Sequence, residues 1–199
     1  MRKPWLWVVV IVALLYGGYQ VFSPRRVVQP PGILVAANPA QAPLGSNPPR
    51  FRKQNASITA VARFEMKARV LGAERYRIDP MAKLMPVDVV FGWGAMSDSK
   101  VLSKLSISQS NRFYFWTTDA FPIPRRDIET HSANMHLIAA NDAIERRIKS
   151  ARVGQLVTVS GYLVEVKSEG GWAINSSLTR EDTGAGACEL VWVEQLDVR

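Results

Sequence analysis

The stretch ITAVARFEMKARV, residues 58–70, decides the fold that the sequence predicts. From Arg63 to Val70 charged and apolar residues alternate one by one. Successive side chains of a β-strand point to opposite faces, so this alternation places the charges on one face and the apolar residues on the other. The stretch therefore predicts a strand that turns one face to a hydrophobic core and the other to water.

A second alternating stretch, VGQLVTVSGYLVEV at residues 153–166, predicts another long strand. Gly161 lies within it, and we expect the strand to bend or bulge there. Residues 168–171, SEGG, predict a hairpin turn after this strand. Shorter strands are predicted at residues 86–91, 112–118, 172–175 and 188–196.

Two helices are predicted in the same part of the chain. Residues 97–105 carry apolar residues at helical spacing after a capping serine or aspartate. Residues 141–152 place Ile144 and Ile148 four residues apart behind a capping asparagine or aspartate. The predicted fold class is therefore α+β, with one β-rich domain over residues 55–199 and about two helices. The glycine-containing strand followed by a hairpin resembles part of a small OB-like barrel, which such a domain can contain.

The start of the chain predicts a transmembrane signal-anchor helix over residues 1–23. An apolar run from Trp5 to Phe22 follows two basic residues. As a helix, residues 4–22 would extend about 28 Å, close to the roughly 30 Å hydrocarbon thickness of a bilayer. Aromatic residues at both ends suit the two membrane interfaces. A cleaved signal peptide is the alternative, because export signals share the basic start and the apolar stretch.

The predicted location is the inner (cytoplasmic) membrane, crossed once, with residues 5–22 in contact with lipid. Arg2 and Lys3 precede this segment and Arg25 and Arg26 follow it, so the basic-residue asymmetry that orients membrane spans is small. We expect the amino terminus in the cytoplasm and the C-terminal domain in the periplasm.

Residues 24–54 predict a proline-rich, basic tether. They hold seven of the twelve prolines of the chain. Proline removes backbone donors and favours extended conformations. We therefore expect this segment to hold the domain off the membrane without a core of its own.

The formal net charge of +8 lies almost wholly in the first part of the chain. Residues 1–54 carry seven basic and no acidic residues, whereas residues 55–199 carry 18 basic and 17 acidic residues. A domain so close to neutral lacks the extended basic surface that nucleic-acid binding uses. The sequence therefore predicts no nucleic-acid partner, and the basic segment suits anionic lipid headgroups.

Two histidines and their acidic neighbours form the first candidate site. Asp127, Glu129 and His131 would share one face of an extended chain, and His136 follows five residues later. Imidazoles and carboxylates can ligate metals or transfer protons. Because His131 and His136 do not have a standard ligand spacing, no metal site and no cofactor are predicted.

Cys188, the only cysteine, is the second candidate. A thiolate beside an imidazole can act as a nucleophile, so Cys188 with His131 or His136 is a candidate catalytic group. Asp182 is a further catalytic candidate beside the histidines. The alternative is that Cys188 is a small buried core residue, as is typical of a lone cysteine that enters an apolar strand.

The polar loop SSLTREDTGAG, residues 176–186, is the third candidate. Ser176, Ser177 and Arg180 are candidate ligand-binding residues, because hydroxyls, an arginine and backbone amides at glycines can receive an anion. The loop lacks the lysine-containing pattern of a nucleotide phosphate loop. A capped turn with an ion pair from Arg180 to a nearby acid is the alternative.

The aromatic residues are the fourth feature. Consecutive aromatics at residues 113–116 would point to both faces of a strand, so some of them must leave the core on one side. If no helix covers that side, it is a ligand or partner surface. Core packing is the alternative for these residues and for Trp93, Trp172 and Trp192.

Four segments together resemble a family of single-pass bacterial membrane proteins to which no activity is assigned. They are GWGAMSD at 92–98, ISQSNRFYFW at 107–116, HSANMH at 131–136 and SSLTREDTGAGACE at 176–189. The resemblance covers about residues 60–195 and implies a protein of the bacterial envelope. It implies no catalytic residues.

The function that the sequence predicts is a membrane-anchored binding or scaffolding protein of the bacterial envelope, which presents its β-rich domain to a protein partner. One alternative is a membrane-tethered hydrolase with a His/Cys or His/Asp site. Another is an accessory subunit of a membrane complex.

Overall fold

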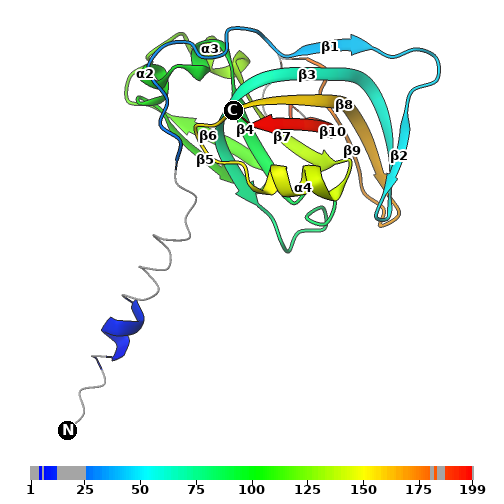
Figure 1. Cartoon of the computed structure of the whole chain (residues 1–199), viewed down its shortest axis with the longest axis horizontal. Coiled ribbons are helices and arrows are strands. Elements are labelled where there is room, and N and C mark those ends of the chain that lie inside the picture. The colour runs from blue at the N-terminus through cyan, green and yellow to red at the C-terminus, as the bar shows by residue number, and fades with distance from the viewer. Residues whose placement is uncertain (1–4, 6, 13–25, 180–181, 183–186, 199) are drawn as a thin grey trace.

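Five strands close into a barrel, and the long strand β3 (Ala56–Arg75) both starts and completes the ring (Figure 1). The ring runs β3, β4, β7, β10, β8 and back to β3, with β7 and β10 parallel and the other pairs antiparallel. A five-stranded Greek-key barrel of this kind is the architecture of OB domains. The other four strands are β4 (Val87–Gly92), β7 (Ser132–Ala139), β8 (Leu156–Ser168) and β10 (Glu189–Val198). The computed structural model describes residues 5, 7–12, 26–179, 182 and 187–198.

The alternation in residues 63–70 builds the face of β3 that lines the barrel. Phe64 and Val70 are fully buried, whereas Glu65 and Lys67 on the opposite face are exposed. Apolar side chains from all five strands meet these residues inside the ring. They include Met66, Val89, Phe91, Met135, Leu137, Val159, Leu163, Val191 and Val193.

Strand β8 contains a glycine where it passes β10 most closely. A Cβ at Gly161 would lie 1.9 Å from the backbone oxygen of Trp192. Only glycine lets the two backbones approach this far. The ladder also shifts by one residue between Val193 and Gln195, as a β-bulge does.

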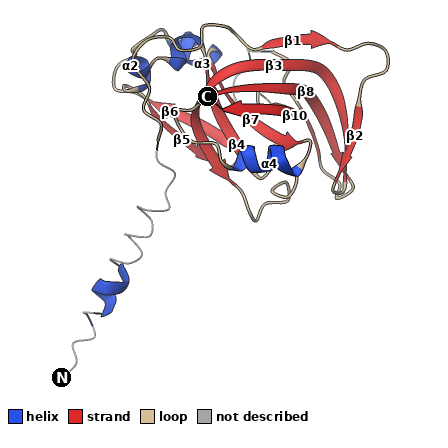
Figure 2. Cartoon of the chain, viewed as in Figure 1, coloured by secondary structure: helices blue, strands red, loops and turns tan. Residues whose placement is uncertain are grey.

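Helix α4 (Asp142–Lys149) packs against β7 and β10 at one end of the barrel (Figure 2). The side chain of Asn141 caps it by accepting a hydrogen bond from the Ile144 amide at 3.0 Å. Ile144 and Ile148 are buried in the barrel core, so the four-residue spacing directs both into the same layer.

Smaller elements surround the barrel. β1 (Ala40–Pro43) and β2 (Arg50–Lys53) pair with β3, and β9 (Ala173–Asn175) pairs with β8. β5 (Ser106–Ser110) and β6 (Phe113–Thr117) form a separate two-stranded hairpin. Beside the hairpin lie the 3-10 turn η1 (Gly94–Ser97) and the short helices α2 (Ser99–Leu102) and α3 (Arg125–Thr130) (Figure 1). Hairpin and helices enclose a further small core with Leu71, Val90, Met96 and Ile128.

The segment predicted to be a tether lies against the domain from residue 26 onward. Val27 donates its amide to the Val153 carbonyl at 2.8 Å, and Gly94 donates to the Val35 carbonyl at 2.7 Å. The buried hydroxyl of Ser97 accepts the amides of Leu34 and Val35. Together with strands β1 and β2, these contacts fasten the segment along one side of the barrel.

The predicted fold class, α+β with an N-terminal transmembrane helix, is wrong. The domain is mostly β-structure with short helices, and no helix among the described residues is long and apolar enough to cross a membrane. The described N-terminal helix over residues 7–12 extends only about 9 Å, against the roughly 30 Å of a bilayer core. Residues 13–22 of the predicted span lie outside the described residues.

This finding also overturns the predictions that depended on the span. The signal-anchor over residues 1–23, the lipid contact through residues 5–22 and the single-pass location in the inner membrane with a periplasmic domain are all corrected. Apolar composition and flanking charge were consistent with a span. They do not fix how many consecutive residues become helical.

Candidate functional site

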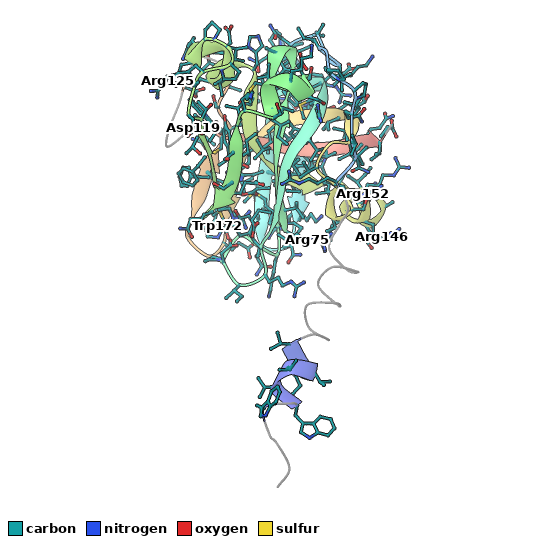
Figure 3. All side chains as sticks on the ribbon, turned by 90° about the vertical axis from the view of Figure 1, so that its left-hand side faces the viewer. Arg75, Asp119, Arg125, Arg146, Arg152 and Trp172 are labelled. Carbon is teal, nitrogen blue, oxygen red and sulfur yellow. The ribbon has the colours of Figure 1, made fainter. Side chains whose placement is uncertain are left out.

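A pocket of about 590 Å³ opens between the hairpin, α3, the start of β7 and the residues that precede β10. Along β6 its wall is strongly aromatic, with Phe113, Tyr114, Phe115, Trp116 and, further on, Phe121. The polar lining includes Arg125, Glu129, Ser132, Asn134, Asp182, Cys188 and Glu189. Arg125 lies on the opposite side of the domain from Arg146 and Arg152 (Figure 3).

The fold brings Asp88, His136 and Cys188 together on the outer face of the barrel. Asp88 and His136 are direct partners in the β4–β7 ladder, and His136 pairs with Leu190 in the β7–β10 ladder. Side chains two residues apart on an extended chain share a face, so Cys188 lies on the same side as Leu190. Cys188 lies close enough to the imidazole of His136 to contribute to raising its pKa. Cys188 is partly exposed and lines the pocket.

Asp88 also lies beside the His136 ring and is fully buried. Nδ1 of His136 is 2.9 Å from Oδ1 of Asp88, but its N–H is not aimed along that line, so the contact is an ion pair and not an aligned hydrogen bond. Nη1 of Arg112 donates to the same carboxylate oxygen at 2.8 Å. Two cationic groups therefore converge on one buried carboxylate.

Arg112 fastens the turn of the hairpin to the barrel. Its Nη2 donates to both carboxylate oxygens of Asp79, at 2.8 and 2.9 Å, and its Nη1 also donates to the Met85 carbonyl at 2.9 Å. The guanidinium lies over the ring of Tyr76, 4.0 Å from its centroid. These contacts hold Arg112 at φ +71°, a backbone conformation that is uncommon for residues other than glycine.

The environment of His136 favours its protonated form. Burial by itself would lower the pKa of His136, but its contacts with Asp88 and Cys188 outweigh this and raise the pKa from 6.5 to about 9. An imidazolium at neutral pH carries a proton on both ring nitrogens. One nitrogen then faces the Asp88 carboxylate, and a cation lies beside the sulfur of Cys188.

Further polar groups between the hairpin and β7 are fixed by hydrogen bonds. Ser132 donates its hydroxyl to the Ile128 carbonyl at 2.6 Å, so the Tyr114 hydroxyl is the donor in its 2.9 Å contact with Ser132. Burial raises the pKa of Tyr114, which keeps this donor protonated. Asn134 donates to the Arg112 carbonyl at 2.8 Å and accepts from Gln109 at 3.0 Å.

The two histidines of the first candidate site separate in the structure. His131 ends helix α3, where its Nδ1 lies 2.8 Å from the Asp127 carbonyl oxygen and its ring packs against Gly94. Glu129 forms an ion pair with Arg125 on the same helix, at 2.8 Å. His131 thus completes a helix end, whereas His136 lies beside Cys188.

The structure brings part of the polar loop together. Ser177 donates its hydroxyl to Asp182 at 2.6 Å, and Ser176 accepts the amide of Leu190 at 3.1 Å. Asp182 also lines the pocket, but it lies with Ser177 and shows no described contact with either histidine. Arg180 lies outside the described residues.

The aromatic residues divide between core and pocket. Trp93 and Trp192 are buried in two different hydrophobic clusters. Trp93 belongs to the barrel core, and Trp192 to a separate cluster with Ile58 and Leu190. Phe113, Phe115 and Phe121 are 41%, 52% and 57% exposed, and all three line the pocket. The aromatic strand β6 therefore contributes to a surface as well as to a core.

Asp88 and Arg112 are not among the candidate residues that the sequence predicts. Asp88 lies within the otherwise apolar stretch PVDVVF, where a charged residue in a buried strand signals a paired site. Arg112 has no comparable signal in the sequence. Their meeting with His136 depends on three segments far apart in the sequence.

Among the residues that the structure describes, no group of three or more His, Cys, Asp or Glu side chains has an arrangement suited to a metal ion. The chain matches no protein-family model, no curated protein and no solved structure.

Proposed function

We propose that this domain is a thiol hydrolase in which Cys188 is the nucleophile and His136 transfers the proton. The observation that carries the proposal is the neighbourhood of three residues. Nδ1 of His136 is 2.9 Å from buried Asp88, and His136 pairs in the β7–β10 ladder with Leu190, two residues after Cys188, which lines the 590 Å³ pocket. Nucleophile, proton-transfer group and orienting acid are the three parts of a covalent hydrolytic site. The pocket volume and its aromatic wall also suit a bound organic substrate.

The reaction begins with the imidazolium of His136 beside the thiolate of Cys188. The sulfur attacks the carbonyl carbon of an ester, thioester or amide, and a C–S bond forms. The bond to the leaving group breaks, and the leaving group takes the proton of His136. Neutral His136 then removes a proton from water, whose oxygen attacks the thioester and releases the carboxylic acid, which restores thiolate and imidazolium.

Asp88 and Arg112 act in this scheme as positioning residues. Asp88 lies 2.9 Å from Nδ1 of the imidazole and limits the movement of the ring beside Cys188. Arg112 donates to Asp88 and to Asp79, which keeps the carboxylate in place beneath the hairpin. Neither residue needs to touch the substrate.

Binding of a protein partner is a second candidate function. The observation that favours it is the group of exposed aromatic side chains Phe113, Phe115 and Phe121 around the pocket. Exposed aromatic side chains gathered at one place are typical of interaction surfaces. A binding domain would use these residues and would not require the thiol of Cys188.

The test uses p-nitrophenyl acetate with the full chain, because acetylation of the single cysteine can be read by mass. We expect a burst of nitrophenolate, an acetylated Cys188 and continued turnover. Cys188→Ala should abolish the burst, and His136→Asn should slow acetylation by about 100-fold, the usual contribution of general acid–base catalysis. His131→Asn changes the other histidine and should keep the wild-type rate.

Two results would overturn the proposal. One is turnover by Cys188→Ala at the wild-type rate. The other is a folded His136→Asn or His136→Gln variant, checked by circular dichroism, that is acetylated as fast as the wild type. If both His136 variants fail to fold, acetylation of native wild-type Cys188 no faster than acetylation of Cys188 in the urea-unfolded chain would equally count against it.

A further inference from the structure

Strand β6 has a partner on one edge only. In the described residues β6 pairs with β5 and with no other strand. Among the described residues, no backbone hydrogen bond outside this ladder involves residues 113–117. In an antiparallel ladder alternate residues direct their N–H and C=O groups away from the partner strand. On the other edge of β6 these groups have no backbone partner within the part of the chain that the structure describes.

The free edge of β6 faces the pocket. All residues from Phe113 to Thr118 line it, whereas no residue of β5 does. Consecutive side chains of a strand point to opposite faces, so a space that contacts all of them runs along the edge of the strand. Cys188 lines the same space.

This edge is less protected than the other edges of the domain. β1 ends in Pro43, β2 carries three basic residues, and β9 has only three residues. Such features discourage another chain from pairing. β6, with the sequence FYFWT, has no charge and no proline, and β5 on its far side lies against β3.

We propose that the substrate of the thiol site is an extended polypeptide, which pairs with the free edge of β6 as a third strand and so places a peptide carbonyl near Cys188. The inference rests on the proposed function. Backbone hydrogen bonds to β6 would supply the alignment. Apolar side chains of the peptide would cover Phe113 and Phe115, which share one exposed face of β6.

The length of β6 sets the length of the ligand. Five residues of strand extend about 17 Å. A peptide of about five residues would therefore fill the edge. Arg125 and Glu129 lie at the α3 side of the pocket, already joined in an ion pair, so the aromatic wall and the strand edge dominate recognition.

The test uses a positional library of acetylated pentapeptides that end in an acyloxymethyl ketone, a group that alkylates thiols. Mass spectrometry follows the labelling of Cys188. The best peptide is then N-methylated at one residue at a time. We expect methylation at alternate residues to slow labelling by about tenfold, and methylation at the residues between them to change it by less than about twofold, since only alternate amides face β6. Chloroacetamide is the small control reagent.

A second variant tests the strand itself. Phe115→Lys places a charge on the exposed face of the edge strand. It should slow labelling by the pentapeptide about tenfold more than it slows labelling by chloroacetamide. Ser108→Lys, at the register partner in β5, is the matched control and should keep the pentapeptide rate.

The outcomes separate this inference from the proposed function. The strand-pairing inference fails if no pentapeptide labels Cys188 faster than chloroacetamide does, or if N-methylation at successive residues slows labelling equally. The thiol site still stands in that case, provided that the chloroacetamide reaction depends on His136. If the chloroacetamide reaction does not depend on His136, the thiol site itself fails. A dimer in solution that Phe115→Lys makes monomeric would show that a second copy covers β6, and would overturn the inference.

Discussion

The pH dependence of stability should reveal the buried His136. The pKa of His136 is raised from 6.5 to about 9 in the folded chain, whereas the unfolded chain returns it to its ordinary value. Below pH 6.5 both states hold the proton and the stabilisation is fully present. Between pH 6.5 and pH 9 only the folded state holds it, so the free energy of unfolding falls as the pH rises.

The expected loss follows from the width of this window. Each pH unit in which only the folded state binds the proton lowers the free energy of unfolding by about 1.4 kcal/mol. Between pH 6.5 and pH 9 the loss attributable to His136 is therefore about 3 kcal/mol. This is a large part of the 5–15 kcal/mol that typically stabilises a domain.

Urea unfolding at pH 6 and at pH 9.5 measures this loss. From pH 6 to pH 9.5 the free energy of unfolding of the wild type and of His131→Gln should fall by about 3 kcal/mol more than that of His136→Gln. Only His136→Gln lacks the histidine at position 136, so the difference in the pH-dependent loss of unfolding free energy is due to that residue. Equal losses in wild type and His136→Gln would refute the account of a histidine held protonated by Asp88 and Cys188.

Three further predictions concern the framework of the site. Arg112→Met should lower the free energy of unfolding by about 3–5 kcal/mol in urea titrations, because Asp79 and Asp88 lose their buried arginine partner. Arg52→Met, which removes an exposed ion pair, should lower it by under about 1 kcal/mol. Gly161→Ala should cost about 1–3 kcal/mol or more, because its Cβ would overlap the Trp192 backbone oxygen, and Gly45→Ala, which has open space, should be nearly neutral in the same thermal melts. Ser97→Ala removes the hydroxyl that accepts the amides of Leu34 and Val35. Proteolysis between residues 26 and 36 should therefore become several-fold faster than in the control variant Ser103→Ala. Equal cleavage rates in the two variants would contradict this role of Ser97.

The strands with strict alternation could be predicted from the sequence. Residues 58–70 lie in β3 and residues 156–166 in β8, because a period of two leaves little choice of structure where one face is buried. The helix with Ile144 and Ile148 also formed, since cap and spacing agree. The interpretation of residues 1–23 as a span is corrected, because no helix among the described residues is long and apolar enough to cross a membrane.

The candidate site could be predicted only in part. An imidazole and a thiol make His136 and Cys188 candidates by their chemistry, but nothing in their sequence separation of 52 residues indicates that they meet. Their neighbourhood arises because β7 and β10 lie side by side in parallel, which is a property of barrel closure. Asp88 joins them through the register of β4 with β7, and Arg112 joins through the turn of a hairpin. Register and closure depend on long-range pairing, which local patterns do not specify.

The most direct test of the central claim is the rate at which iodoacetamide alkylates Cys188 at pH 6. The chain has one cysteine, so the rate of mass increase reports that thiol alone. We expect the native wild type and His131→Asn to react at least about tenfold faster than His136→Asn, because a cation beside the sulfur favours the reactive thiolate. Equal rates in wild type and a folded His136→Asn variant would contradict the claim that His136 activates Cys188.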